Sequence, residues 1–229
     1  MELTLYGQST VLIRMSEVSM LTDPWWGQFE FMRGVPIAAN PELIEKLDLM
    51  LVSHNHIDHW SNPAIRLARK LGTTVVGSQK AVSRAEKHGL EDAVELKPGE
   101  EYEFGGIVIK AVPAFHPFAK DAIGFVVEGE KTLYFSGDTR YTPELEEALG
   151  RFELDAALLQ AACSNYPFIG KDGMDLDSAA RLAGAIKPKL VIPIHYQVRG
   201  KVLEPEELKA WSAPVPVAVL DPGVPLHID

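Results

Sequence analysis

The chain has 229 residues, of which 46% are hydrophobic and 24% charged, so it can bury a large core and disorder is not expected. The formal net charge of −10 at pH 7 argues against a protein whose main partner is nucleic acid, because phosphate binding needs clustered Lys and Arg. The single cysteine, Cys163, excludes an intrachain disulfide and any site made of several thiolates.

The first part of the chain predicts three short strands. Residues 3–6 alternate in polarity, residues 9–14 are rich in β-branched side chains, and residues 18–22 form a further apolar run. The dipeptide Asp23-Pro24 then marks a turn. We therefore expect the chain to begin with hairpin-connected strands that end at Asp23.

Helix starts are marked by a polar residue followed by proline at the first helical position. Four such starts predict helices, at Asn40-Pro41, Asn62-Pro63, Thr142-Pro143 and Glu204-Pro205. Apolar spacing predicts two further helices, over residues 79–89 and 178–186.

Short apolar runs separate these helices, and each predicts a strand that is buried on both faces. The alternation of helices and strands is typical of a layered α/β fold, and no linker-like segment divides the chain, so we expect one domain over residues 1–229. The predicted strands are 49–52, 73–76, 107–112, 124–127, 132–135, 156–159, 190–194 and 215–219.

The segment His54-Asn55-His56-Ile57-Asp58-His59 places four potential metal ligands directly after the strand 49–52. In an extended segment, positions i and i+2 point the same way, so His54 and His56 can share one ion. Asp58 and His59 face a second site if the chain turns after Ile57. Three imidazoles and a carboxylate packed this closely would be unfavourable without a cation.

Three further strands end close to a potential ligand. His116 follows the strand 107–112, Asp138 follows 132–135 and His195 follows 190–194. Any one of these residues alone is explained as a polar residue at the end of a strand. Together with the cluster, they predict a preorganised metal site held on loops by rigid strands.

The run His54-Asn55-His56-Ile57-Asp58-His59 resembles the HxHxDH signature of the metallo-β-lactamase superfamily, and His116, Asp138 and His195 match its later motifs in order. The resemblance covers nearly the whole chain. It implies an α/β fold, a four-layer αββα sandwich of two mixed β-sheets flanked by helices. The most similar branches are the ascorbate-6-phosphate lactonase-like and the N-acylphosphatidylethanolamine phospholipase D-like hydrolases.

The resemblance also implies a ligand set with two metal ions. Asp138 would bridge the two ions, and Asp23 resembles the family's aspartate that steadies a ligand histidine, although a turn residue before Pro24 is the alternative. The first ion would be held by His54, His56 and His116, and the second by Asp58, His59 and His195.

The implied activity is metal-dependent hydrolysis. A metal-bound hydroxide would attack a lactone, ester or phosphodiester, and Asp58 is the candidate catalytic residue that orients the nucleophile or carries a proton. Imidazole and carboxylate ligands suit two divalent ions, Zn or Mn first and Fe or Ni next. The alternative function is a mononuclear iron dioxygenase of the persulfide dioxygenase type on the same fold.

Several residues outside the ligand set are candidates for substrate contact. The aromatic segment that begins with Trp25 and Trp26 forms a hydrophobic substrate wall or a lid, or else it packs against the edge of a sheet or at a subunit interface. The other candidates, which follow the predicted ligands or occupy a nearby loop, are Arg140, Tyr166, Lys171 and Tyr196.

The sequence also gives expectations about location and partners. No apolar run reaches the length of a membrane span, and the N-terminus lacks the pattern of a signal peptide, so we expect a cytoplasmic protein. The expected partner is a small-molecule substrate, nucleic acid is disfavoured by charge, and relatives of this kind often form homo-oligomers.

Overall fold

Two mixed β-sheets lie face to face in the computed structural model, which describes residues 1–229 except for the side chain of Pro205. In spatial order, the first sheet contains β15 (Leu226–His227), β1 (Glu2–Gly7), β2 (Thr10–Met15), β3 (Val18–Thr22), β4 (Leu49–Val52), β5 (Thr74–Gly77) and β6 (Ala93–Glu95). The second sheet contains β14 (Val191–Ile194), β11 (Ala156–Gln160), β10 (Thr132–Phe135), β9 (Ile123–Glu128), β8 (Ile107–Pro113) and β7 (Glu101–Phe104).

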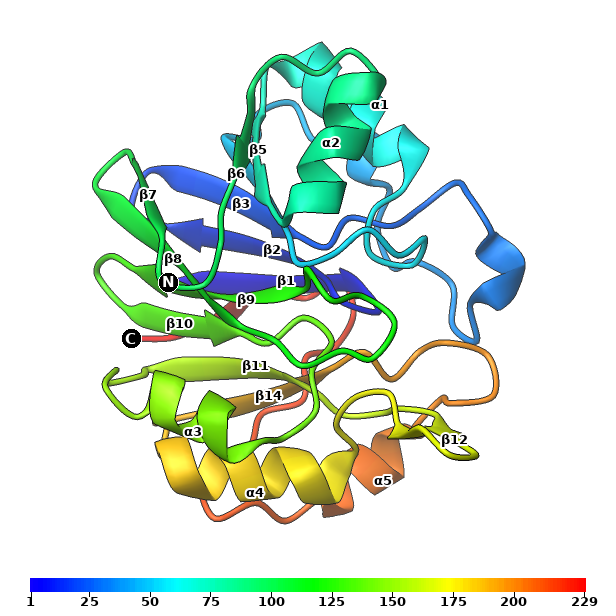
Figure 1. Cartoon of the computed structure of the whole chain (residues 1–229), viewed down its shortest axis with the longest axis vertical. Helices are drawn as coiled ribbons and strands as arrows, with labels where there is room; N and C mark the ends of the chain where they lie inside the picture. Colours follow the sequence, from blue (N-terminus) through cyan, green and yellow to red (C-terminus); the bar gives the residue numbers. More distant parts are fainter.

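Helices cover the outer face of each sheet (Figure 1). The first sheet packs against α1 and α2 through one apolar cluster, and the second packs against α3 and α4 through another. These elements confirm the predicted four-layer αββα sandwich. The helices are α1 (Asn62–Leu71), α2 (Gln79–Lys87), α3 (Pro143–Leu149), α4 (Leu176–Ile186) and α5 (Pro205–Ala210).

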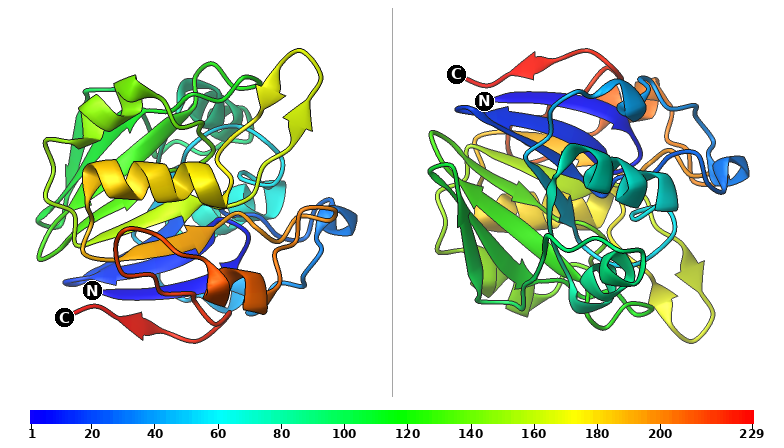
Figure 2. Two further views of the ribbon diagram at one scale, coloured as in Figure 1. Left: turned by 90° about the horizontal axis from the view of Figure 1, so that it is seen from below. Right: turned by 90° about the horizontal axis from the view of Figure 1, so that it is seen from above.

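The largest apolar cluster fills the space between the two sheets. It combines side chains of both sheets, such as Leu5 and Leu51 from the first and Phe125 and Leu158 from the second, all with no exposed surface. Burial of apolar side chains on both sides of each sheet explains the continuous apolar runs seen in the sequence. The two chain ends lie side by side (Figure 2), where the Met1 amino group donates to the Ile228 carbonyl at 3.1 Å.

The strand directions place the functional residues at one edge of the sandwich. Strands β3, β4 and β5 are parallel, and so are β10, β11 and β14. Strand β8 is antiparallel to β9, which is antiparallel to β10, so β8 points the same way as β10. The carboxyl ends of these strands therefore deliver their following loops to the same side of the molecule.

Two predicted elements are wrong. The segment after Asn40 forms only a single 3-10 turn, η2 (Pro41–Leu43), because the chain must extend again to place Asp48 against Ser19, at 2.8 Å from its backbone nitrogen, before β4 begins. The predicted strand 215–219 makes one isolated bridge at Val217, since Pro216 has no N–H to donate to a sheet.

The structure also contains short strands that were not predicted, and one helix cap lies one residue away from its predicted position. Strands β6 and β7 lack a clear apolar run, as do the small hairpin strands β12 (Asn165–Tyr166) and β13 (Gly170–Lys171). The cap of α1 is Ser61, one residue before Asn62, and its hydroxyl accepts from the backbone nitrogen of Ala64.

Replacing Asp175 with alanine should lower the free energy of unfolding by about 1 kcal/mol at pH 7. Asp175 caps α4, accepting from the Ser178 backbone nitrogen at 3.1 Å and from its hydroxyl at 2.6 Å. Burial works to raise the pKa of Asp175, but the bonds from Lys171 and Ser178 outweigh it and lower the pKa to about 2.

Because the folded pKa lies below the unfolded value, this stabilisation is present above about pH 4 and is lost as the pH falls towards 2. Urea unfolding at several pH values measures it. The matched control is Asp177→Ala, which removes an exposed carboxylate from the same helical turn. Equal destabilisation by the two variants at pH 7 would contradict the assignment of Asp175 as the cap.

Candidate metal centre

All the predicted ligand residues meet at the shared edge of the two sheets. The first ligand group consists of His54, His56 and His116, and the second consists of Asp58, His59 and His195. Within each group, one ligand atom per residue lies within 4.8 Å of the others. Asp138 follows β10 and lies against the second group.

The first ligand group joins the two sheets. His54 and His56 follow β4, whereas His116 follows β8. The Nε2 atom of His116 and the Nδ1 atom of His56 are 3.3 Å apart, and the ring centroids of His54 and His56 are 4.4 Å apart. Two imidazole lone pairs repel at this distance unless a cation or a proton lies between them. The arrangement therefore favours a metal ion.

The second ligand group is surrounded by carboxylates. The Nε2 atom of His59 lies 3.6 Å from Asp58 Oδ2 and 3.4 Å from Asp138 Oδ2. The Nε2 atom of His195 lies 3.5 Å from Asp58 Oδ2 and 3.2 Å from Asp138 Oδ1. Asp138 thus offers one oxygen to each of these two histidines.

Hydrogen bonds at Nδ1 orient four of the histidine rings. Carbonyl and carboxylate oxygens only accept, and the Ser53 hydroxyl already donates its proton to Asp23, so the Nδ1–H of each bonded ring donates and Nε2 is left free to bind a metal ion. The Nδ1 partners are Ser53 Oγ for His54 at 2.9 Å, Asp23 Oδ2 for His59 at 2.7 Å, Asp172 O for His116 at 2.7 Å and Ala162 O for His195 at 3.3 Å.

Asp23 lies behind His59, on the side of the ring away from Asp138. Its carboxylate accepts from the Ser53 backbone nitrogen at 2.7 Å, from the Ser53 hydroxyl at 2.6 Å and from His59 Nδ1. The residue is fully buried, and its φ of 34° is unusual for a side chain other than glycine. This geometry favours a residue that steadies a ligand over a simple turn residue.

Gly137 allows the loop of Asp138 to approach the loop of the histidine cluster. Its φ is 53°, and a Cβ atom there would lie 2.5 Å from the Ser53 side chain. Any larger residue would therefore force the two ligand loops apart.

Burial and neighbouring charges shift the pKa values at the site. Burial lowers the pKa of His54 well below its usual range, and it also lowers that of His56. Burial alone would lower the pKa of His59, but the adjacent carboxylates, led by Asp138, raise it well above the usual value. Burial would raise the pKa of Asp138, but His195 and His59 lower it well below the usual value. Asp138 is therefore held in the charged form, and the protonated form of His59 is favoured beside it, whereas His54 and His56 are held neutral.

Several buried atoms that face this centre have no hydrogen-bond partner among the described residues. They are His54 Nε2, His59 Nε2, His195 Nε2 and Asp138 Oδ1. Leaving such atoms unpaired costs free energy, and all are imidazole nitrogens or carboxylate oxygens, which bind divalent transition metals through a lone pair. The residues therefore fit metal ions at this place.

The structure corrects the interpretation of Trp25 and Trp26 as a substrate wall. Trp25 is 0% and Trp26 4% exposed. The indole nitrogen of Trp25 donates to the Gln28 carbonyl at 2.7 Å, and Trp26 packs in the cluster beneath α1 and α2. Both residues are therefore packed inside the protein, within the chain's own fold, and line no substrate site in this structure.

Arg140 and Lys171 hold a hairpin beside the centre. Arg140 donates to the carbonyls of Ile169, at 2.7 Å, and of Lys171, and Lys171 pairs with Asp175. The hairpin is formed by β12 and β13. Both cations are therefore engaged within the protein in this structure.

Tyr166 and Tyr196 lie in different surroundings. Tyr166 is 40% exposed on the hairpin, and its ring stands edge-on to Phe118, which contacts the ring of His116. Tyr196 is buried, which raises its pKa to about 12, and it lines a separate cavity of about 590 Å³ beside Trp211. Only Tyr166 of the two is thus placed near the ligand groups.

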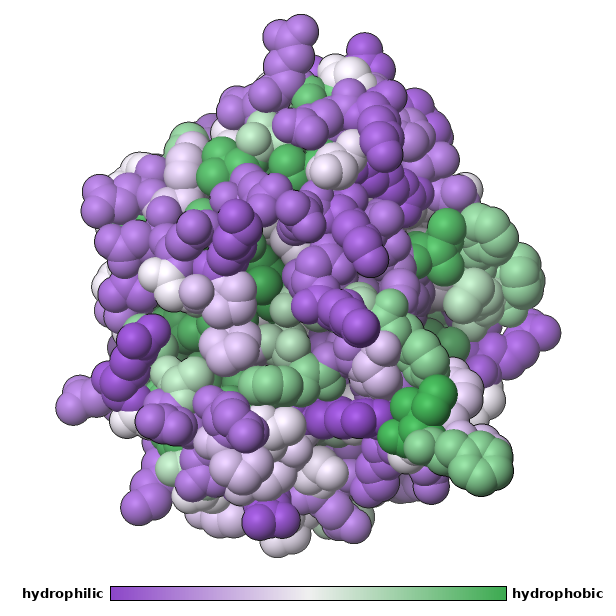
Figure 3. All heavy atoms as spheres, viewed as in Figure 1, coloured by the Kyte–Doolittle hydropathy of each residue, from purple (hydrophilic) through white to green (hydrophobic). Residues whose placement is uncertain are grey.

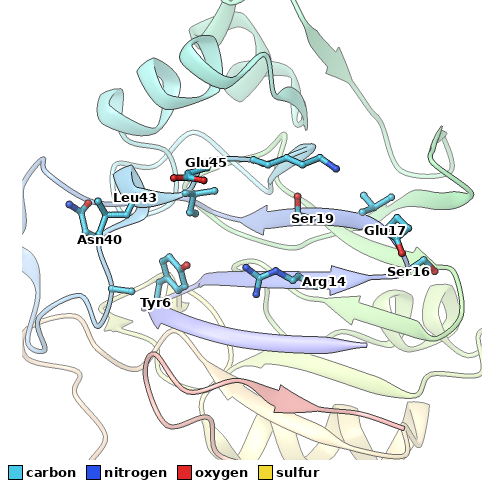
Figure 4. Close-up of a pocket in the computed structure, with 12 residues that line it drawn as sticks. Tyr6, Arg14, Ser16, Glu17, Ser19, Asn40, Leu43 and Glu45 are labelled. Carbon is cyan, nitrogen blue, oxygen red and sulfur yellow. The ribbon is translucent and has the colours of Figure 1, made fainter.

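The largest cavity that we describe does not belong to the metal centre. It has a volume of about 740 Å³ and lies on the outer face of β1–β3, under the segment after Asn40 (Figure 4). Tyr6, Arg14 and Glu45 are among its lining residues, and none of the predicted ligands is. Cavity size alone would have misplaced the site.

The sequence did not identify the residues that support the ligands. Ser53, Asp172 and Ala162 bond to ligand histidines or to Asp23, and two of these bonds use only a backbone carbonyl. A backbone carbonyl carries no sequence signal. Arg33 and Gln8, which are buried near the centre, were also missed.

Two mixed sheets between helix layers, with His and Asp ligands at their common edge, define a metal-dependent hydrolase of the metallo-β-lactamase fold. A family model described as the beta-lactamase superfamily domain matches residues 19–196. The chain belongs to this family, and the matched range includes every predicted ligand.

Curated relatives agree with this class. A UPF0173 metal-dependent hydrolase of Thermoplasma acidophilum is 32% identical over 219 residues, which cover 92% of this chain and 90% of the relative. A UPF0173 metal-dependent hydrolase of Thermus thermophilus is 31% identical over 239 residues, which cover 100% of this chain and 99% of the relative.

Solved structures share the fold. An isothiocyanate hydrolase from Delia radicum gut bacteria has a TM-score of 0.85 at 20% identity, covering 99% of this chain and 98% of its own. A metallo hydrolase from Ignicoccus hospitalis has a TM-score of 0.80 at 20% identity, covering 100% of this chain and 99% of its own.

In the described part of the chain, no helix is long and apolar enough to span a membrane.

Proposed function

We propose that this protein hydrolyses a lactone, ester or phosphodiester at a centre that holds two divalent metal ions. The observation that carries this proposal is the pair of ligand groups with Asp138 against the second of them, and the buried ligand atoms His54 Nε2, His59 Nε2, His195 Nε2 and Asp138 Oδ1, which have no hydrogen-bond partner among the described residues. His54, His56 and His116 would hold the first ion. Asp58, His59 and His195 would hold the second, with Asp138 between the two.

Two such ions supply a hydroxide nucleophile at neutral pH and offset the charge that develops on the oxygen of the substrate. The protein's own part is orientation. The Nδ1 bonds fix four imidazole rings, so the ligand atoms need little rearrangement on binding. Asp58, whose pKa is lowered by the histidines against the effect of burial, remains an acceptor that orients the nucleophile or takes a proton.

The surface around the centre favours a substrate with an apolar part. Exposed apolar side chains gather on the loop after β3 and on the β12–β13 hairpin (Figure 3), where Phe31 is 67% and Phe168 109% exposed. The rings of His116, Phe118 and Tyr166 form a continuous contact from the first ligand group to that hairpin. We assign this aromatic path to the apolar portion of the substrate.

Metal analysis of the purified protein tests the proposal. We expect two equivalents of Zn or Mn per chain and hydrolysis of members of a panel of lactones, esters and phosphodiesters after reconstitution. One equivalent of Fe with consumption of oxygen would instead support the alternative, a mononuclear dioxygenase. A protein that binds two ions and hydrolyses no member of the panel would contradict the proposed substrate class.

A further inference from the structure

Arg33 is a buried cation on the loop between β3 and β4. Its side chain is 3% exposed and its guanidinium carbon lies 3.8 Å from the centroid of the Trp25 ring. One edge of the guanidinium is occupied, because Nη2 donates to the Trp25 carbonyl and Nε lies 2.9 Å from Glu30 Oε2. The Nη1 atom has no hydrogen-bond partner in the described structure.

The loop that carries Arg33 is fastened to the chain just after His195. The Gly34 nitrogen donates to the Gln197 carbonyl at 2.7 Å, and the Arg199 nitrogen donates to the Met32 carbonyl at 2.7 Å. Gly7 makes room for the guanidinium, since a Cβ atom there would lie 3.1 Å from Arg33 Nη1 and 3.4 Å from Gln197 Oε1. The free edge of Arg33 is thus placed by several elements at once.

Gln8 adds a second unpaired donor to the same region. Its carbonyl accepts from the backbone nitrogen of His195 at 3.0 Å, and its Oε1 accepts from the Gln197 nitrogen at 3.0 Å. Gln8 is 1% exposed, its φ is 56°, and its Nε2 has no partner within the described residues. Backbone strain of this kind is kept where the surroundings require one geometry.

We propose that Arg33 Nη1 and Gln8 Nε2 form an anion-binding subsite beside the second ligand group, which takes a carboxylate or phosphate group of the substrate. This inference rests on the proposed hydrolase function and specifies the substrate, which carries an anionic group in addition to its scissile bond. Two buried donors without acceptors match the two oxygens of such a group.

The local charges support an external anion as the missing partner. The carboxylate of Glu30, whose side chain is 45% exposed, forms an ion pair with Arg33 Nε, while neither Nε nor the buried Nη1 makes a hydrogen bond among the described residues. Burial lowers the pKa of Arg33, while Glu30 and then Asp58 raise it, so Arg33 lies within the electrostatic reach of a ligand of the second group. The loop of Arg33 is also bonded to Gln197, two residues after His195, so an anion bound at Arg33 would lie on the side of the second ligand group.

The test measures the dissociation constants of benzoate and of inorganic phosphate for the Zn-loaded protein by calorimetry. We expect Arg33→Gln to weaken the binding of at least one probe by about tenfold or more, with the metal content unchanged. Gln8→Glu keeps the Oε1 acceptor but replaces the donor Nε2 with a carboxylate oxygen that repels an anion, so it should weaken the binding of the same probe. Arg14→Gln, which removes an arginine paired with Glu2 on the outer face, is the matched control and should bind normally.

Kinetics on matched esters with and without a carboxylate provide a second readout. Arg33→Gln should raise KM for the anionic ester and leave the neutral one within about threefold, and Arg33→Lys should recover part of the loss. Unchanged probe binding in both Arg33→Lys and Gln8→Glu, or equal losses on both esters, would overturn the subsite. If no ester is hydrolysed but probe binding depends on Arg33, the hydrolase proposal fails while the anion site stands.

Discussion

Replacing Asp138 with alanine should give a folded protein whose hydrolytic activity is reduced about a thousandfold or more. Asp138 places one carboxylate oxygen 3.4 Å from His59 and the other 3.2 Å from His195, so its loss removes a carboxylate that contacts two members of the second ligand group. Stabilisation of charge by metal ions contributes several kcal/mol, and each 1.4 kcal/mol corresponds to about tenfold in rate. His56→Ala should have a similar effect through the first ligand group.

The measurement is turnover of the best panel substrate together with metal content and circular dichroism. The control is Asp155→Ala, which removes an aspartate on a loop outside the centre that accepts from the Thr132 backbone nitrogen at 2.8 Å. The control should keep its activity. Undiminished turnover in Asp138→Ala or His56→Ala, with two ions still bound, would refute the dinuclear mechanism.

Asp23→Asn should weaken the binding of metal at the second ligand group by about ten- to a hundredfold. The carboxylate of Asp23 accepts the Nδ1 proton of His59, which directs Nε2 at the metal position. An amide nitrogen in place of Oδ2 would instead meet two donors, the Ser53 hydroxyl and His59 Nδ1. The ring of His59 would then lose the bond that fixes its orientation and tautomer.

Zinc titration against a competing chelator measures this effect. Asp48→Asn is a close control, because Asp48 accepts from the backbone nitrogen and the hydroxyl of Ser19 in the same way that Asp23 accepts from those of Ser53, but it contacts no histidine. Both variants should lose stability, and only Asp23→Asn should lose metal affinity. Equal zinc affinity in the two would show that Asp23 serves the fold alone.

Most of the metal centre was readable from the sequence because its ligands carry their own chemistry. A histidine or aspartate that follows a strongly apolar strand can be recognised from its residue type. Four predicted strands are followed by such a residue, namely His54, His116, Asp138 and His195. Helices with a proline at the first turn were also predicted correctly where enough chain followed, as in α1 and α3. The helix predicted after Asn40 does not form, because too few residues separate Asn40 from the start of β4.

The sequence by itself determined the layered fold and indicated the His and Asp side chains that the structure brings together, since apolar periodicity and metal-binding side chains are properties of residue type and order. The tertiary structure alone decided the rest. It buried Trp25 and Trp26, engaged Arg140 and Lys171 within the protein, and left Arg33 Nη1 without a partner. These outcomes depend on which distant segments meet, and on backbone carbonyls that every residue offers, so no local pattern encodes them.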